Sequence, residues 1–204
     1  MTKNHQRILA LAAILGPIQS VAGWLIAGSL WHGYDPIKKT ISDLAADDSP
    51  VQMIQSGFFL VGATLTLIVA IYAKWLAEPG RIIIFAAGIA TYGLTVFTTP
   101  SQDGHSDLHR LFAIISFVLY SAWPLFSTRM SPSAPWVLRP AATIGVTVLL
   151  TVVSVWFLLT WTDPNSSMVG LAERVIVVLQ SWYMAFVIWV CLHHERKRPQ
   201  STLN

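Results

Sequence analysis

The residues best suited to chemistry lie in one short polar stretch, Ser101–Arg110, which reads SQDGHSDLHR. It contains two histidines, two aspartates and an arginine, although only 11% of the 204 residues in the chain are charged. Histidine titrates near neutral pH and can both accept and donate a proton. His109 is therefore the first candidate for a general acid or base, with His105 and Asp107 as further catalytic candidates.

A metal site is the alternative for the same stretch. His105 and His109 stand four residues apart, and on one helix face they could chelate a divalent metal such as zinc, with Asp103 or Asp107 as an oxygen ligand. Gly104 argues against a helix that extends back to His105, so metal-free acid–base chemistry is the preferred interpretation. Because the chain has one cysteine, Cys191, a multi-cysteine metal site and an intrachain disulfide are both excluded.

Two more polar segments carry candidate residues, Tyr34–Pro50 and Asp163–Arg174. In the first of them, Asp43 is a candidate catalytic carboxylate. Ser42, beside it, is either a nucleophile with His109 as its base or simply a helix cap.

Charged residues also lie in the first turns of two apolar runs, Arg110 in one and Glu173 and Arg174 in the other. Ionisable groups at that depth are costly unless they are paired or face a water-filled cavity. We expect ion pairs between segments, either Glu173 with Arg110 or Asp43 with Arg174. Glu173 is a catalytic candidate and both arginines are candidate substrate-binding residues; the alternative is that these charges snorkel to the interface and fix the depth of the helices.

Aromatic and amide side chains offer an apolar counterpart to these charges. Trp24, Trp156 and Trp182 lie well inside apolar runs, Gln180 is at a similar depth, and Tyr34 follows the first run. They either pack the protein interior or line a cavity in which aromatic faces hold an apolar or cationic substrate.

Six apolar runs separate the polar segments, and each is long enough to cross a bilayer as a helix: residues 8–30, 51–76, 82–98, 108–127, 140–161 and 170–192. The chain is 54% hydrophobic, and its charged share is less than half of the roughly 25% that is typical of soluble domains. The sequence therefore predicts an all-α integral membrane protein, with residues 1–204 forming one domain of six transmembrane helices. Residues Thr40–Ala46 predict a short interfacial helix after the first span, capped by Thr40 or Ser42.

The distribution of basic residues predicts the orientation of the spans. If the N-terminus is inside, nine of the 13 Lys and Arg residues lie on the inner side and four on the outer side. The positive-inside rule then places both termini in the cytoplasm and the three polar segments on the outer face. Because the basic excess lies at helix ends, it does not indicate binding to nucleic acid.

The run YDPIKKTISDL at Tyr34–Leu44 is the most specific part of a resemblance to a known family. With Gly57, Gly62, the histidine-containing loop before the fourth span and Glu173–Val175, it resembles the six-span prokaryotic membrane proteins grouped as domain of unknown function 998. The resemblance covers nearly the whole chain and implies the fold and the membrane location. A looser similarity is to the alkaline ceramidase and adiponectin-receptor superfamily, whose members use Ser, Asp and three His around zinc. This chain departs from them because its last span lacks their histidine pair at the proper depth.

These observations favour an enzyme that acts on a lipid or isoprenoid-like substrate by acid–base chemistry, at the outer face of a prokaryotic plasma membrane. Hydrolysis and protonation-driven cyclisation both fit histidines and carboxylates placed above an aromatic cavity. The alternative is a non-enzymatic lipid-binding, transport or accessory protein with structural charges. The sequence predicts neither an oligomeric state nor a particular substrate.

Overall fold

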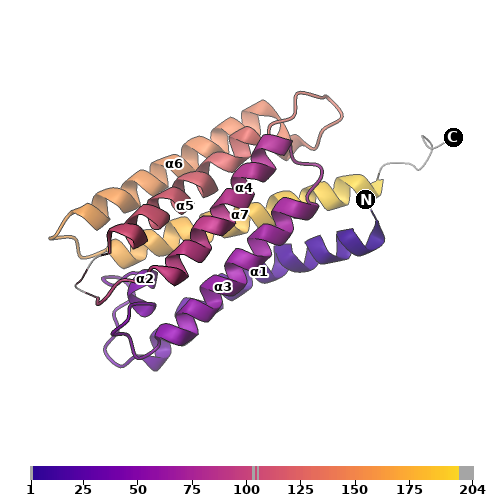
Figure 1. Cartoon of the computed structure of the whole chain (residues 1–204). Coiled ribbons are helices and arrows are strands. Elements are labelled where there is room, and N and C mark those ends of the chain that lie inside the picture. The colour runs from indigo at the N-terminus through magenta and orange to yellow at the C-terminus, as the bar shows by residue number, and fades with distance from the viewer. Residues whose placement is uncertain (1, 103, 105, 198–204) are drawn as a thin grey trace.

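Six long helices run side by side in the computed structural model, which describes residues 2–102, 104 and 106–197 (Figure 1). All six are long and apolar enough to cross a membrane. They are α1 (Lys3–Leu30), α3 (Gln52–Tyr72), α4 (Glu78–Val96), α5 (Asp107–Phe126), α6 (Pro140–Thr162) and α7 (Val169–Lys197). Two short helices, α2 (Ile41–Leu44) and the 3₁₀ helix η1 (Trp136–Leu138), lie between them. The predicted all-α fold with six transmembrane helices is confirmed.

The long helices close into a ring in which each packs against two neighbours. The order around the ring is α1, α3, α4, α5, α6 and α7, and α7 packs against α1 to complete it. A ring of six helices is too wide for the side chains on its inner faces to fill everywhere. The centre of the bundle is therefore the place where a cavity is expected.

A large apolar cluster fills much of the half of the bundle that carries both termini. Buried apolar residues from every long helix except α6 meet there, including Leu9, Val69, Ile84, Trp123 and Ile188. Large apolar side chains cover much of the outer surface instead of being buried. Such a surface is expected where the surrounding solvent is lipid rather than water.

The opposite end of the bundle holds the three polar segments (Figure 1). Backbone hydrogen bonds join them directly: Asp47 N–H donates to the Thr99 carbonyl at 2.9 Å, and Leu171 N–H donates to the Ile37 carbonyl at 3.0 Å. The sequence predicted that these segments share one side. We call this the loop end of the bundle; its assignment to the outer face of the membrane stays a prediction.

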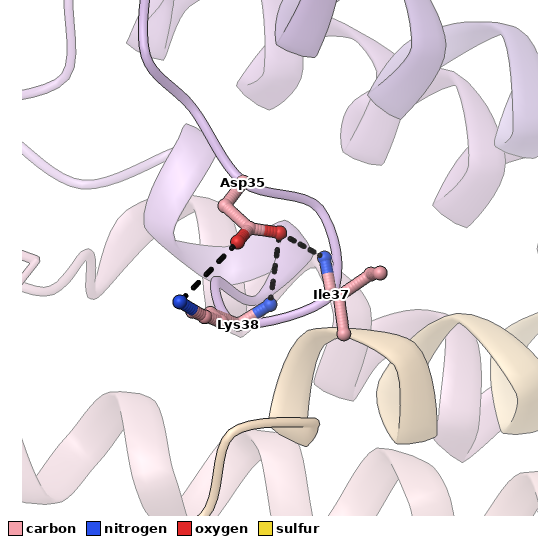
Figure 2. A network of polar contacts seen from close by, with 3 residues as sticks. All are labelled: Asp35, Ile37 and Lys38. Atoms are coloured by element: carbon pink, nitrogen blue, oxygen red, sulfur yellow. Dashed lines mark hydrogen bonds and ion pairs between the residues drawn. The ribbon is translucent and has the colours of Figure 1, made fainter.

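Hydrogen bonds within the first polar segment determine its local shape. Asp35 Oδ1 accepts from the backbone N–H groups of Ile37 and Lys38 at 2.9 and 3.4 Å, and Asp35 pairs with Lys38 Nζ at 3.9 Å (Figure 2). Thr40 then caps α2 through a reciprocal capping box, in which Thr40 Oγ1 accepts from Asp43 N–H at 3.0 Å and Asp43 Oδ2 accepts from Thr40 N–H at 2.7 Å. Of the two predicted caps, Thr40 is therefore the one used.

Candidate functional site at the loop end

Two cavities meet beneath the loops. The loop cavity, of about 490 Å³, lies among the polar segments and the first turns of α5 and α7. The central cavity, of about 160 Å³, lies inside the ring and is lined by α1, α3, α4, α5 and α7. Ser42, Ala113, Phe117 and Glu173 line both. A molecule with a polar head and an apolar tail could therefore occupy the two together.

The central cavity is elongated along the bundle. On α7 its wall extends from Glu173 to Ala185, which is roughly 18 Å at the helical rise of 1.5 Å per residue. Val69 and Met184 belong both to the cavity wall and to the packed cluster near the termini. The cavity therefore runs into the membrane from the loop end and ends at that cluster.

His109 lies in the first turn of α5, where the Ser106 hydroxyl caps the helix by accepting from His109 N–H. The ring lines the loop cavity and its residue is only 2% exposed. Its Nδ1 atom is 2.8 Å from the Phe97 carbonyl oxygen. A carbonyl can only accept, so Nδ1 carries the hydrogen, and Nε2 of the neutral ring is an unprotonated acceptor. Nε2 is buried and has no partner among the described residues.

Glu173 lies in the first turns of α7 and is buried between the two cavities. Its Oε2 atom accepts a hydrogen bond from the backbone N–H of Ile41, and the Ser42 hydroxyl also interacts with its carboxyl group. Glu173 therefore joins α2 to α7 at the place where the cavities meet. The same contact puts Ser42 beside a carboxyl group, although Thr40 rather than Ser42 caps the helix.

Arg174 holds the first polar segment in place. It is 6% exposed and donates to the carbonyls of Lys39 and Gly170, each at 2.9 Å, and to the Tyr34 hydroxyl at 2.5 Å. Its guanidinium also lies over the ring of Trp24, 5.1 Å from the centroid. The expected ion pairs are not formed: the terminal nitrogens of Arg174 donate to carbonyls and a phenol, its Nε is buried without a partner among the described residues, and Glu173 and Asp43 accept from backbone N–H groups.

Tyr34 and Trp24 belong to the set of residues that surround the Arg174 side chain. The Tyr34 hydroxyl donates to the Thr40 carbonyl at 2.7 Å, and burial raises the pKa of the phenol, which keeps it protonated. Neither residue lines either cavity in the structure. The geometry therefore favours a positioning role over substrate binding for these two residues and Arg174.

Arg110, unlike the buried Arg174, lies at the rim of the loop cavity. Its side chain is exposed, and its guanidinium lies 5.3 Å from the centroid of the Trp161 ring. Asp107, one turn earlier, is exposed and has interactions of its own. Of the two arginines predicted to bind substrate, Arg110 is the one that faces a cavity.

Asp43 also lines the loop cavity. Burial raises the pKa of its carboxyl group, and the hydrogen bonds from Thr40 oppose the shift only in part. Asp103 and His105 lie outside the described residues, so these two predicted metal ligands have no structural description. Within the described part of the chain, no group of three His, Cys, Asp or Glu side chains is placed to hold a metal.

The structure places the deeper aromatic and amide candidates in different surroundings. Gln180 lines the central cavity and donates to the Phe117 carbonyl and the Ser121 hydroxyl, both at 3.1 Å. Trp156 packs in a separate apolar cluster between α6 and α7, and Trp182 is 52% exposed on the lipid-facing surface. Neither tryptophan lines a cavity.

Sequence reasoning missed two amide side chains of the central cavity. Gln19 of α1 and Gln55 of α3 line it, and the Oε1 atom of each is buried without a hydrogen-bond partner among the described residues. An unpaired buried acceptor is costly, and a ligand or ordered water that donates to it would remove the cost. A glutamine inside an otherwise apolar run was the available signal.

The fold and the site together define a multi-pass integral membrane protein with a polar pocket at one end of its helical bundle. A family model described as "Protein of unknown function (DUF998)" matches residues 14–193. The chain therefore belongs to this family, as the resemblance of its polar motifs implied. No curated protein and no solved structure matches the chain.

Proposed function

We propose that this protein is a membrane-embedded hydrolase of a lipid or isoprenoid-like ester or phosphoester, with His109 as the general base. One observation supports the proposal: His109, a residue of the wall of a polar cavity that continues into an apolar one, has a buried Nε2 that is unprotonated in the neutral ring and has no partner among the described residues. An enzyme that cleaves a membrane lipid needs this combination, because the reacting bond is polar and the rest of the substrate is not.

The reaction follows from the state of the ring. His109 Nε2 takes a proton from a water molecule while the water oxygen forms a bond to the carbonyl carbon or phosphorus of the substrate. The bond from that atom to the leaving oxygen breaks, and the proton on Nε2 passes to the leaving oxygen. The Nδ1–H bond to the Phe97 carbonyl fixes the ring and stabilises the imidazolium that exists between these steps.

Hydrolysis is favoured over protonation-driven cyclisation because cyclisation needs an acid that is protonated at the start. The neutral tautomer of His109 is a base, and its one N–H group, at Nδ1, donates to the Phe97 carbonyl. Transport is disfavoured because the central cavity ends at the packed cluster near the termini. A lipid-binding protein without turnover is the alternative that shares this geometry.

The setting we propose is the plasma membrane of a prokaryote, with the loop end on the extracytoplasmic face. Among the described residues, eight basic residues at the end with the termini against four at the loop end support this orientation. The substrate would enter from the lipid, place its head among the loops and extend its tail into the central cavity.

The test is turnover of membrane lipids by a His109→Asn variant. The asparagine amide can still donate to the Phe97 carbonyl but has no titrating nitrogen, so folding should be retained while turnover falls at least about 100-fold. Purified protein in liposomes made from a prokaryotic lipid extract would be followed by mass spectrometry for new products. His32→Asn is the matched control, because His32 is exposed at the same end. Wild-type turnover in His109→Asn would contradict the proposal, and substrate bound without any product in the wild type would favour the lipid-binding alternative.

A further inference from the structure

The charged side chains that line the loop cavity differ in whether they have hydrogen-bond or ion-pair partners. Its two acids among the described residues, Asp43 and Glu173, each accept a hydrogen bond from a backbone N–H group at the start of α2. Of the three Lys and Arg side chains described in its wall, Lys38 is paired with Asp35 at 3.9 Å. Lys39 and Arg110 form no ion pair with another described residue. Lys39 and Arg110 are therefore the cations of the described cavity wall that no ion pair satisfies, although Asp43 and Glu173 line the same cavity.

Lys39 and Arg110 are both held at the cavity by their surroundings. The Arg110 guanidinium rests on the Trp161 ring, which itself stacks on Phe157 with ring centroids 5.8 Å apart, and both aromatic rings line the cavity. Stacking of this kind leaves the N–H groups at the edge of the guanidinium available to an anion. Lys39 Nζ donates to Gln102 Oε1, and the Lys39 carbonyl is fixed by Arg174.

Two more polar atoms in the cavity wall have no partner among the described residues. They are Thr99 Oγ1, which can donate a hydrogen bond, and His109 Nε2; both atoms are buried, and their residues line the cavity. A guanidinium, an ammonium and a hydroxyl around one cavity match the several acceptor oxygens of a phosphate group. A volume of about 490 Å³ leaves space for a head larger than a carboxylate.

We propose that the loop cavity binds the phosphate-bearing head of an amphiphile through Arg110 and Lys39, with the apolar tail in the central cavity. The inference deepens the proposed function by naming the class of its substrate, and it rests on that function only in placing the substrate in the same two cavities. Binding itself requires no turnover.

The experiment measures dissociation constants for three probes with purified protein in an uncharged maltoside detergent at low salt. Dodecyl phosphate carries both head and tail, dodecanol lacks the phosphate, and inorganic phosphate lacks the tail. Quenching of tryptophan fluorescence or a shift of the unfolding temperature reports binding. Dodecyl phosphate should bind at least about tenfold more tightly than either of the other probes, because a hydrogen bond to a charged group is worth about 1.5–3 kcal/mol.

Variants separate specific binding from general attraction of an anion to a basic protein. Arg110→Gln and Lys39→Gln should each weaken dodecyl phosphate binding about tenfold, and dodecanol binding should not change. Lys74→Gln removes the same charge from an exposed position at the opposite end and should have no effect. Equal effects of Arg110→Gln and Lys74→Gln would overturn the proposal.

Two further outcomes are decisive. If dodecanol or inorganic phosphate binds as tightly as dodecyl phosphate, the head or the tail, respectively, contributes nothing and the amphiphile assignment is wrong. The His109→Asn variant should still bind dodecyl phosphate. If that variant keeps both its binding and its turnover, the proposed catalytic role fails while the headgroup site stands.

Discussion

His109 and Arg174 are both buried at the loop end, but their hydrogen bonds give them different roles. His109 has one ring nitrogen bonded to a backbone carbonyl and one without a partner, whereas Arg174 donates to three protein oxygens. The sequence identified both as unusual because charged and titratable groups are costly at a helix end in a membrane. It could not separate them, because the oxygens to which Arg174 donates belong to residues up to 140 positions away.

Asp43 gives a prediction for stability against pH. Burial raises the pKa of its carboxyl group above the ordinary value of about 3.9, so the folded protein holds this proton to higher pH than the unfolded chain does. The contribution of the protonated Asp43 carboxyl group to stability is therefore fully present below about pH 4. It is lost as the pH rises through the raised pKa of this group. The unfolding temperature of wild type in detergent should fall across this window, and that of Asp43→Asn should fall less.

The control for this prediction is Asp163→Asn, which changes an exposed carboxyl group at the same end of the bundle. Its pH profile should parallel that of the wild type. If Asp43→Asn and wild type show the same slope over the window, the Asp43 carboxyl group does not retain its proton in the folded state.

Among the elements, α2 could be predicted and its location could not. The capping box needs only Thr40 and Asp43, three residues apart, so a local pattern was enough to find the helix. Its position against α7 depends on close contact between two backbones. Leu171 N–H bonds to the Ile37 carbonyl, and the missing side chain of Gly170 makes room for the Lys39 carbonyl. The spacing of apolar and polar residues in the sequence does not indicate such a backbone contact.

Gly170→Ala should therefore detach the first polar segment from α7. A Cβ atom at this position would lie 2.0 Å from the Lys39 carbonyl oxygen and 2.6 Å from that of Pro36. Both neighbours are backbone atoms, so the segment must move, and we expect a loss of about 1–3 kcal/mol in the free energy of unfolding. Thermal or chemical unfolding in detergent measures it, together with faster hydrogen exchange in residues 34–44.

Gly145→Ala in α6 is the matched control. A Cβ atom there meets nothing within 4 Å, and alanine is a better helix former than glycine, so stability should stay the same or rise slightly. An equal loss in both variants, or none in either, would show that α7 does not depend on Gly170 for this contact.

For the whole molecule, six apolar runs were enough to predict six helices, because length and hydropathy alone decide whether a segment spans a membrane. The ring and its cavities were not predictable in this way. Apolar residues of α7 are both buried and exposed, so its sequence does not show which of the apolar residues face inward. Trp182, considered for the cavity, is exposed to lipid, whereas Gln19 and Gln55 line the interior.

The orientation of the bundle predicts which loops a reagent outside the cell can reach. With both termini cytoplasmic, a cysteine at Asn165 should react in intact cells with a membrane-impermeant maleimide, and one at Ser133 should react only after lysis. Both positions are exposed, and the native Cys191 is buried, so it contributes little background. Labelling of Ser133→Cys alone in intact cells would reverse the orientation and place the site in the cytoplasm.

Occupation of both cavities by one amphiphilic molecule can be tested by cryo-electron microscopy of the protein in a nanodisc containing prokaryotic lipids. We predict elongated density with its head between Arg110, Lys39 and His109 and its tail passing Ser42 and Glu173 into the central cavity. Lipid density confined to the outer surface of the helices, with both cavities holding only water, would contradict it.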